Sequence, residues 1–391
     1  MVTLLKKVFY WLKILFFYIT TFIVGLFVLK RKDLVVITAS KGKYYNGNAK
    51  ALFEYIQTRD DLEAYYFISK KSLFDTLSKE RNNIVYHYSL KGLRLFVRAR
   101  TVCITHGYAD FLGYFPSIWQ NWIYLGHGIG TKALGYLKNK LSLLEKLQIY
   151  FNKFYFYIIT SDFDRYMFSA MNHKKPSKII ITGYPRTDEL YREAELKKKK
   201  NSSNILYAPT YREDGITEVF HLEGFSLSKL TSFLEEKNIF LNIRFHPNNY
   251  LQSREAIGGI INSSDNIIDK SPDVIGDPQD LLIDSDILIT DYSSISRDYL
   301  FLDRPMIFTM NDIGQENKLS LPPIRKEFAF PGYKIMSYLE LENALSEIIE
   351  GKDRFSESRQ FVRDLSYNYI DGNSSRRVTN LIKDLANVKN D

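Results

Sequence analysis

Histidine, arginine and serine residues gather where the predicted strands end. The apolar strand predicted at Trp122–Gly126 runs directly into His127. The strand predicted at Phe240–Phe245 carries Arg244 and runs into His246. Further polar residues follow these and other predicted strands in the same way: Lys132, Arg186, Arg212, Asp291, Ser293 and Ser294. Because ligands of open α/β sheets bind at the carboxyl ends of the strands, we expect these residues to line one shared cleft.

The types of these side chains suit a substrate that carries phosphate. Arginine binds phosphate oxygens in bidentate fashion and lysine supplies a point charge, so four cations can neutralise a diphosphate: Lys132, Arg186, Arg212 and Arg244. Ser293 and Ser294 lie where a predicted strand turns into a helix, so their hydroxyls and backbone N–H groups can face an anion. His127 and His246 are the candidates for proton transfer or phosphate contact near neutral pH.

Several other chemistries lack their motif in this sequence. There is no Gly-x-Ser-x-Gly nucleophile elbow and no Gly-x-x-x-x-Gly-Lys phosphate loop. Asp284 and Asp286 precede a predicted strand instead of following it, so we interpret them as a helix end and a loop. We therefore expect no metal ion or other cofactor, and we predict group transfer on a nucleotide diphosphate without a covalent enzyme intermediate.

Short apolar runs alternate with helical patterns along the chain after Lys32. Most runs are continuously apolar, which is typical of strands that are buried on both faces of a parallel sheet. The alternation predicts a doubly wound α/β architecture. The predicted strands are Val35–Ser40, Ala64–Ser69, Ile84–Tyr88, Thr101–Thr105, Trp122–Gly126, Tyr157–Ser161, Lys178–Thr182, Asn204–Ala208, Phe240–Phe245, Ile267–Asp269, Ile287–Thr290 and Met306–Thr309.

A polar stretch at 197–204, four lysines followed by Asn-Ser-Ser-Asn, is typical of a linker between domains. We predict a membrane-associating apolar segment at 1–32 and two Rossmann-like domains at 33–200 and 201–365, with a cleft between them. The remaining residues, 366–391, are predicted to form a helix that crosses back to the first domain.

Composition and charge exclude several classes of protein. The 391 residues are 45% hydrophobic and 25% charged, which is enough for a buried core and excludes a disordered chain. A single cysteine, Cys103, excludes a disulfide framework. The net charge of +8 is concentrated in residues 1–32, which hold six basic residues and no acidic one. Since a nucleic-acid binder carries its basic stripe on folded domains, we expect no nucleic-acid partner and a membrane surface instead.

An apolar run from Val8 to Leu29 is interrupted only by Lys13. Its uncharged part is too short to cross a bilayer, whereas the full run just reaches across the hydrocarbon core of about 30 Å. We expect an anchor at the cytoplasmic face that spans or lies in the membrane, and a buried helix on the first domain is the alternative. The stretch Tyr136–Thr160 is rich in apolar residues and lysine, which predicts either a second interfacial helix or an ordinary amphipathic one.

A set of short motifs resembles the CDP-glycerol glycerophosphotransferase family, which comprises teichoic acid primases and polymerases. The resemblance covers roughly residues 35 to 385, and it rests on the order and spacing of the motifs. One departure is Gly126, which stands where the family usually has tryptophan before the motif histidine. The motifs are Gly126-His127-Gly128 with Lys132 and Gly135, Gly183 to Asp188, Tyr207 to Arg212, Arg244 to Pro247, Thr290 to Ser294, Asp303 to Pro305, Pro331-Gly332, and Asp371-Gly372 with Arg376.

The resemblance implies a GT-B fold and a membrane-associated enzyme. The implied reaction is attack by a hydroxyl of a lipid-linked acceptor on the β-phosphorus of CDP-glycerol, with release of CMP. In that reaction His127 is the base, and five residues hold the diphosphate: His246, Arg244, Arg212, Ser293 and Ser294. The first domain then faces the acceptor and the membrane, and the second binds the CDP-polyol donor.

Several alternatives stay open on the sequence. The donor can be CDP-glycerol or CDP-ribitol, and the enzyme can add one unit or many. A GT-B glycosyltransferase with a nucleotide-sugar donor is a second hypothesis, and a non-catalytic membrane-tethered scaffold is a third. His106-Gly107 repeats the pattern of His127-Gly128 at the end of another predicted strand, so a role on the acceptor side is an alternative to a structural one.

Overall fold

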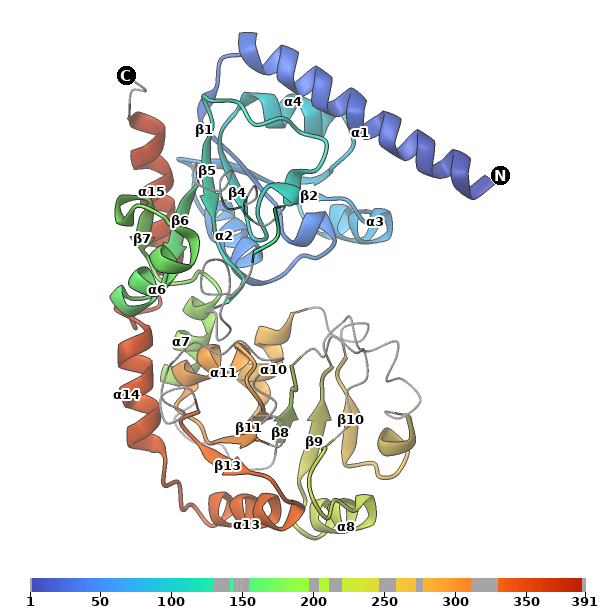
Figure 1. The fold of residues 1–391 in the computed structure, drawn as a ribbon, viewed down its shortest axis with the longest axis vertical. Helices are drawn as coiled ribbons and strands as arrows, with labels where there is room; N and C mark the ends of the chain where they lie inside the picture. The colour runs from blue at the N-terminus through green and yellow to red at the C-terminus, as the bar shows by residue number, and fades with distance from the viewer. Residues whose placement is uncertain are drawn as a thin grey trace. The chain divides into compact units, whose positions relative to one another are not determined.

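The computed structural model describes residues 2–128, 141–143, 146, 149, 155–196, 204–210, 220–245, 258–271, 277–310 and 330–388 (Figure 1). The chain divides into two compact units. Unit 1 comprises Met1–His127, Leu141–Asp188 and Asn373–Asp391, and unit 2 comprises Gly128–Lys140 and Glu189–Gly372. The cleft expected between the two units stays a prediction.

Unit 1 is built on a parallel sheet of seven strands in the order β3-β2-β1-β4-β5-β6-β7. The chain runs outward from β1 to β3 and then returns to the other side of β1 with β4. The carboxyl ends of β1 and β4 therefore form the switch point at which ligands of such sheets bind. The strands are β1 (Arg31–Ile37), β2 (Glu63–Ile68), β3 (Ile84–Tyr86), β4 (Ala99–Ile104), β5 (Asn121–Tyr124), β6 (Phe156–Ile159) and β7 (Ile179–Ile181).

Two helices of unit 1 begin after a serine whose hydroxyl accepts a backbone N–H group of the first turn. Ser89 Oγ accepts the N–H of Gly92 at 3.0 Å, and Ser161 Oγ accepts that of Asp164 at 3.1 Å. The α-helices are α1 (Val2–Phe27), α2 (Gly47–Gln57), α3 (Lys71–Glu80), α4 (Leu90–Arg98), α6 (Asp162–Asn172) and α15 (Ser374–Asn387). Short 3₁₀ turns are η1 (Ser40–Gly42), η2 (Tyr108–Phe111) and η4 (Pro176–Lys178).

Helix α1 lies along α4, at the edge of unit 1 (Figure 1). One narrow face is buried: Phe17 is 5% exposed and packs edge-on against the rings of Tyr88 and Tyr114. Thr21 Oγ1 accepts the N–H of Phe115 at 2.8 Å. The opposite face exposes large apolar side chains such as Phe16 and Ile19. The helix is therefore both a cover for the core of unit 1 and an apolar outer surface.

The last helix, α15, packs against α2, β1 and β4 of unit 1, although it follows unit 2 in the chain. Its first two backbone N–H groups, at Ser374 and Ser375, donate to the carboxylate of Asp188, both at 2.8 Å. Gly183 lies against the same turn with a φ of 76°, and a Cβ there would stand 2.4 Å from the hydroxyl of Ser374. Only glycine fits this close approach in the left-handed region.

Unit 2 is built on a parallel sheet of six strands in the order β10-β9-β8-β11-β12-β13. The switch point lies between β8 and β11, because the chain runs from β8 to β10 on one side and continues from β11 on the other. The strands are β8 (Asn204–Tyr207), β9 (Phe240–Ile243), β10 (Ile267–Asp269), β11 (Ile287–Thr290), β12 (Met306–Thr309) and β13 (Tyr333–Ile335).

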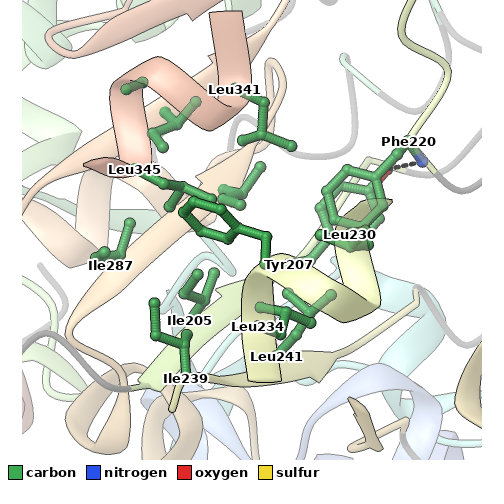
Figure 2. Packing of buried hydrophobic residues seen from close by; sticks show 14 of the residues in the cluster. Ile205, Tyr207, Phe220, Leu230, Leu234, Ile239, Leu241, Ile287, Leu341 and Leu345 are labelled. Carbon is green, nitrogen blue, oxygen red and sulfur yellow. Dashed lines mark hydrogen bonds between the residues drawn. The ribbon is translucent and has the colours of Figure 1, made fainter. Parts of the chain in front are cut away.

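One core of unit 2 packs the face of its sheet against α8 and α13 (Figure 2). Tyr207 stacks on Phe220 with ring centroids 4.1 Å apart, and its hydroxyl accepts the N–H of Phe220 at 3.2 Å. A capping box of Ser337 and Glu340 begins α13. The helices of unit 2 are α7 (Thr187–Leu196), which begins in unit 1, α8 (Leu227–Glu236), α10 (Pro278–Asp284), α11 (Ile295–Tyr299), η5 (Leu300–Leu302), α13 (Tyr338–Ile349) and α14 (Ser356–Ser366).

The predicted α/β fold with two parallel sheets is confirmed, and each of the twelve predicted strands is present, three with the predicted bounds and the others with ends that differ by a few residues. The thirteenth strand, β13, was not predicted, because its three residues include the exposed Lys334 and form no apolar run. The interfacial helix predicted at Tyr136–Thr160 falls largely outside the described residues, and its end at Phe156–Ile159 is strand β6 instead.

Candidate functional site

The switch point of unit 1 is organised by the buried carboxylate of Asp110. One oxygen accepts the backbone N–H of Lys41 at 2.8 Å. The other accepts the backbone N–H groups of Thr105, at 2.7 Å, and His106, at 2.8 Å, and the hydroxyl of Thr105 at 3.2 Å. The carboxylate thus joins the loop after β1 to the end of β4. Because these bonds go to a charged acceptor, each is stronger than an ordinary backbone hydrogen bond.

The loop after β1 holds three successive residues in the left-handed region: Ser40, Lys41 and Gly42, with φ values of 49°, 61° and 73°. Such a conformation is costly for residues other than glycine. Besides Asp110, Ser69 holds it in place, since its N–H donates to the carbonyl of Gly42 at 2.7 Å and its hydroxyl donates to that of Lys41 at 2.6 Å. This strained loop is therefore fixed from two sides at the switch point.

His127 follows β5, the strand next to β4. Its Nδ1 lies 3.2 Å from the carbonyl oxygen of Thr105 and 3.4 Å from the hydroxyl of Tyr124. A carbonyl oxygen only accepts hydrogen bonds, so Nδ1 carries the proton and donates. In the neutral ring, Nε2 is then unprotonated. This arrangement provides a general base with a defined basic atom.

The ring of His106 stacks on that of His127, with centroids 4.4 Å apart and planes inclined by 7°. Nδ1 of His106 lies 2.8 Å from the hydroxyl of Thr105. Both imidazoles thus bond to Thr105, one at its hydroxyl and the other at its carbonyl. Both residues are exposed, so the pair stands at the accessible edge of the sheet.

Although part of the His127 side chain is exposed to solvent, protein atoms pack closely around its ring. This partial loss of solvation lowers its pKa to about 4. The positive potential of His106 lowers the pKa of His127 further, while the hydrogen bond to Thr105 raises it. Burial also lowers the pKa of His106. At neutral pH both rings are therefore neutral, which is the state in which His127 can accept a proton.

The backbone around His127 is supported by residues far away in the chain. Asn48 Nδ2 donates to the carbonyls of Leu125, at 2.8 Å, and Gly126, at 3.2 Å. The guanidinium of Arg186 donates to the carbonyl of His127 at 2.8 Å. Gly126 has a φ of 66°, in the left-handed region that glycine tolerates, and the hydroxyl of Tyr184 would stand 3.3 Å from a Cβ there. These contacts hold the turn that presents His127.

Unit 2 carries a second set of predicted residues at the carboxyl ends of adjacent strands. Asp291, after β11, accepts the backbone N–H of Thr210, after β8, at 3.0 Å and binds its hydroxyl, across the switch point. Arg244 follows β9, is 8% exposed, and donates to the carbonyl of Lys270 at 3.2 Å. Burial lowers its pKa, while the carboxylates of Asp277 and Asp280 raise it.

Ser293 and Ser294 follow Asp291 and are partly exposed. The helix that we expected to begin there, α11, has only five residues, and the side chain of Ser294 makes no capping hydrogen bond. The carbonyl of Ser293 accepts the hydroxyl of Ser296 at 2.8 Å. Both hydroxyls lie at the switch point, where β11 turns into α11, and anion binding by these hydroxyls and the backbone N–H groups stays a prediction.

The predicted site residues thus fall into three groups. His127 and Arg186 lie together in unit 1, whereas Arg244, Asp291, Ser293 and Ser294 lie at the strand ends of unit 2. Lys132, Arg212 and His246 lie outside the described residues. Sequence reasoning missed the roles of Asp110 and Thr105, whereas Asn48 belongs to an Asn-Gly-Asn loop whose function the sequence leaves open. The repeated His-Gly pair at His106 was the only signal of its proximity to His127.

A family model described as CDP-Glycerol:Poly(glycerophosphate) glycerophosphotransferase matches residues 20–384. A teichoic acid glycerol-phosphate transferase of Staphylococcus aureus (strain NCTC 8325 / PS 47) is 27% identical over 211 residues, which are 48% of this chain and 52% of that protein. The match therefore spans about half the length of this curated relative.

Solved structures of the wall teichoic acid polymerase TagF share the fold. A histidine variant has a TM-score of 0.73 and 20% identity, with 91% of this chain and 90% of that chain covered. UDP-GlcNAc 2-epimerase from Neisseria meningitidis, bound to UDP-GlcNAc, has a TM-score of 0.51 and 13% identity, with 89% and 99% covered. These likenesses confirm the predicted GT-B-like fold class.

Proposed function

Because the chain belongs to the CDP-glycerol:poly(glycerophosphate) glycerophosphotransferase family, we propose that it transfers a polyol phosphate from CDP-glycerol or CDP-ribitol to a hydroxyl of a lipid-linked acceptor, in the synthesis of a teichoic-acid-like or capsular polymer. The observation that carries this proposal is the state of His127: Nδ1 donates to the carbonyl of Thr105, so Nε2 is the basic atom at an accessible strand end. A transfer to a hydroxyl needs such a base.

In the proposed reaction, Nε2 of His127 takes the proton of the acceptor hydroxyl as the oxygen forms a bond to the β-phosphorus. The bond between the β-phosphorus and the bridging oxygen breaks, and CMP leaves with the electron pair. The imidazolium of His127 then loses its proton to solvent. Catalysis of phosphoryl transfer rests on positioning and on charge neutralisation, so no covalent intermediate on the protein is needed.

The diphosphate is proposed to bind at the strand ends of unit 2. Arg244 supplies a buried guanidinium, and the hydroxyls of Ser293 and Ser294 lie two strands away, across β8. The Thr210–Asp291 bonds fix the switch point between them. Lys132, Arg212 and His246 complete the proposed set, on the basis of the motifs alone.

A donor screen tests this function. The full chain is incubated with CDP-glycerol, CDP-ribitol or a UDP-sugar and a lipid-linked acceptor, and the released nucleotide and the product are analysed. We expect CMP from at least one CDP-polyol and a product that has gained one polyol phosphate per CMP. Release of UDP from a UDP-sugar, with no CMP from either CDP-polyol, would replace the proposal with a glycosyltransferase. Turnover with none of the donors would favour a non-catalytic scaffold.

The lipid-linked acceptor fits the apolar outer face of α1, which we propose binds the cytoplasmic face of the membrane peripherally. Phe9, Trp11 and Phe27 are 69%, 60% and 82% exposed. The face continues beyond the helix, since Phe22 packs edge-on against Phe115, at a centroid distance of 5.0 Å, and Ile118 is 80% exposed. Exposed apolar patches of this extent mark interaction surfaces.

Among the helices of the described residues, none has the length and apolar character needed to cross a bilayer. The sequence leaves open whether the anchor spans the membrane or lies in it, and we propose a helix that lies in the interface. Such a helix buries one apolar face at the boundary of headgroups and acyl chains. Lys30 at its end donates to the carbonyl of Val97, which ties the helix to α4.

A further inference from the structure

We propose that His106 is a positioning residue for the base: it holds the plane of the His127 ring so that Nε2 faces the acceptor hydroxyl. This inference rests on the proposed function, because it assigns a role within that reaction. It stands on the stacking of the two rings and on their shared anchor, Thr105.

His127 has little support from its own neighbours in the chain. Gly126 and Gly128 flank it and have no side chains that could pack against its ring. One hydrogen bond, from Nδ1 to the carbonyl of Thr105, restrains rotation of the ring about its Cβ–Cγ bond, but at 3.2 Å it is long for an N–H···O bond. A flat contact with a second ring removes this rotation. The hydrogen bond and the stack together define the direction of Nε2.

His106 is suited to this task because it is itself anchored. Its Nδ1 lies 2.8 Å from the hydroxyl of Thr105, and its backbone N–H donates to Asp110. Asp110 is fully buried and also binds the N–H of Thr105. The two rings are therefore held parallel by one residue, Thr105, which is in turn fixed by one carboxylate. Any shift of His106 would be transmitted to His127.

The charge of the pair matters for the same step. When His127 takes up a proton, a neutral His106 presents its π face to the imidazolium, which is a favourable contact. If His106 is already protonated, two like charges face each other and His127 accepts its proton less readily. Other charged and titratable groups around the pair are Asp110 on η2, Lys41 on η1, Arg186 before α7 and Tyr124 on β5.

The test compares His106→Ala with His106→Phe in the full chain. Alanine removes the stack, and we expect kcat to fall about 10- to 100-fold while KM for CDP-glycerol changes less than about twofold. Phenylalanine keeps a flat ring and, unlike histidine, cannot become protonated at acid pH. We expect it to restore kcat to within about fivefold of the original and to move the acid limb of kcat against pH upward, because the positive potential that lowers the pKa of His127 is gone.

His221→Ala is the matched control, because His221 is an exposed histidine in unit 2. It should change neither kcat nor the pH profile. A titration of ¹⁵N-labelled histidine in the His106→Phe chain, followed by NMR, gives a readout that needs no turnover: the pKa of His127 should rise. If the unsubstituted chain releases no CMP from any CDP-polyol, the proposed function fails, while this titration still tests the stack.

Two results would overturn the positioning role. One is a His106→Ala chain whose kcat stays within about twofold of the original with an unchanged acid limb. The other is a folded His106→Phe chain that loses as much kcat as the alanine variant and shows no change in the titration of His127. If the alanine variant fails to fold, the second result still decides the question, because it depends only on the folded phenylalanine variant.

Discussion

The apolar face of α1 gives the most direct quantitative prediction. Phe16 lies on this face and is 55% exposed. An aromatic side chain has about 200 Å² of surface, so membrane binding would bury about 110 Å² of it. At about 25 cal/mol per Å², this burial contributes about 2.7 kcal/mol. Phe16→Gln should therefore weaken the partition coefficient for vesicles by nearly 100-fold.

Point substitutions test this better than deletion of the helix. Phe17 and Thr21 on the buried face contact Tyr114 and Phe115, so removal of α1 would expose the core of unit 1. The assay is co-sedimentation of the full chain with vesicles of phosphatidylcholine and phosphatidylglycerol. Leu339→Gln is the matched control, because Leu339 is 64% exposed on α13 and is far from this face in the chain.

A Phe16→Gln chain that binds vesicles as well as the original chain would refute the reasoning. So would an equal loss of binding in Leu339→Gln, because the effect would then reflect general surface hydrophobicity and not this face. If binding depends on phosphatidylglycerol, the basic residues that flank α1 contribute through the surface potential.

Three further predictions concern unit 1. His127→Ala should lower CMP release about 10²- to 10⁴-fold with an unchanged circular dichroism spectrum, as expected for loss of a general base; a loss below about tenfold would remove it from the mechanism. Asp188→Ala removes two charge-assisted bonds from the start of α15 and should lower the free energy of unfolding by about 2–3 kcal/mol in urea, with Asp188→Asn losing less. Burial lowers the pKa of His87 to about 4, below its unfolded value of about 6.5, so the unfolded chain binds this proton more tightly. Stability should be full above about pH 6.5 and should fall by up to about 1.4 kcal/mol per pH unit towards pH 4; His87→Gln should remove this part of the slope.

The strands could be predicted from the sequence because a strand buried on both faces is apolar at every position. β11 is an example: Ile287 to Thr290 is a continuous buried run, and its predicted bounds are the observed ones. The position of His127 at a strand end followed from the same pattern. β13 has no such run, and it is a strand because its backbone pairs with β12.

The support of the site could not be predicted in the same way. Asp110 is only one of 45 acidic residues in the sequence, and it lies in a short 3₁₀ turn with no distinctive motif. Its role comes from the proximity of the ends of β1 and β4, which depends on strand order. The contact between His106 and His127 likewise follows from the parallel pairing of β4 with β5, in which Ile104 lies opposite Tyr124. Sequence periodicity carries no information on such pairings.

The bonds between Asp188 and the start of α15 have a consequence for how the protein is made. Unit 1 comprises Met1–His127, Leu141–Asp188 and Asn373–Asp391, so the whole of 189–372 is inserted before its last segment. During synthesis the second sheet can be completed while the first still lacks the helix that covers β1 and β4. In ribosome-bound chains that stop before Asn373, residues 189–372 should therefore resist protease better than residues 1–188.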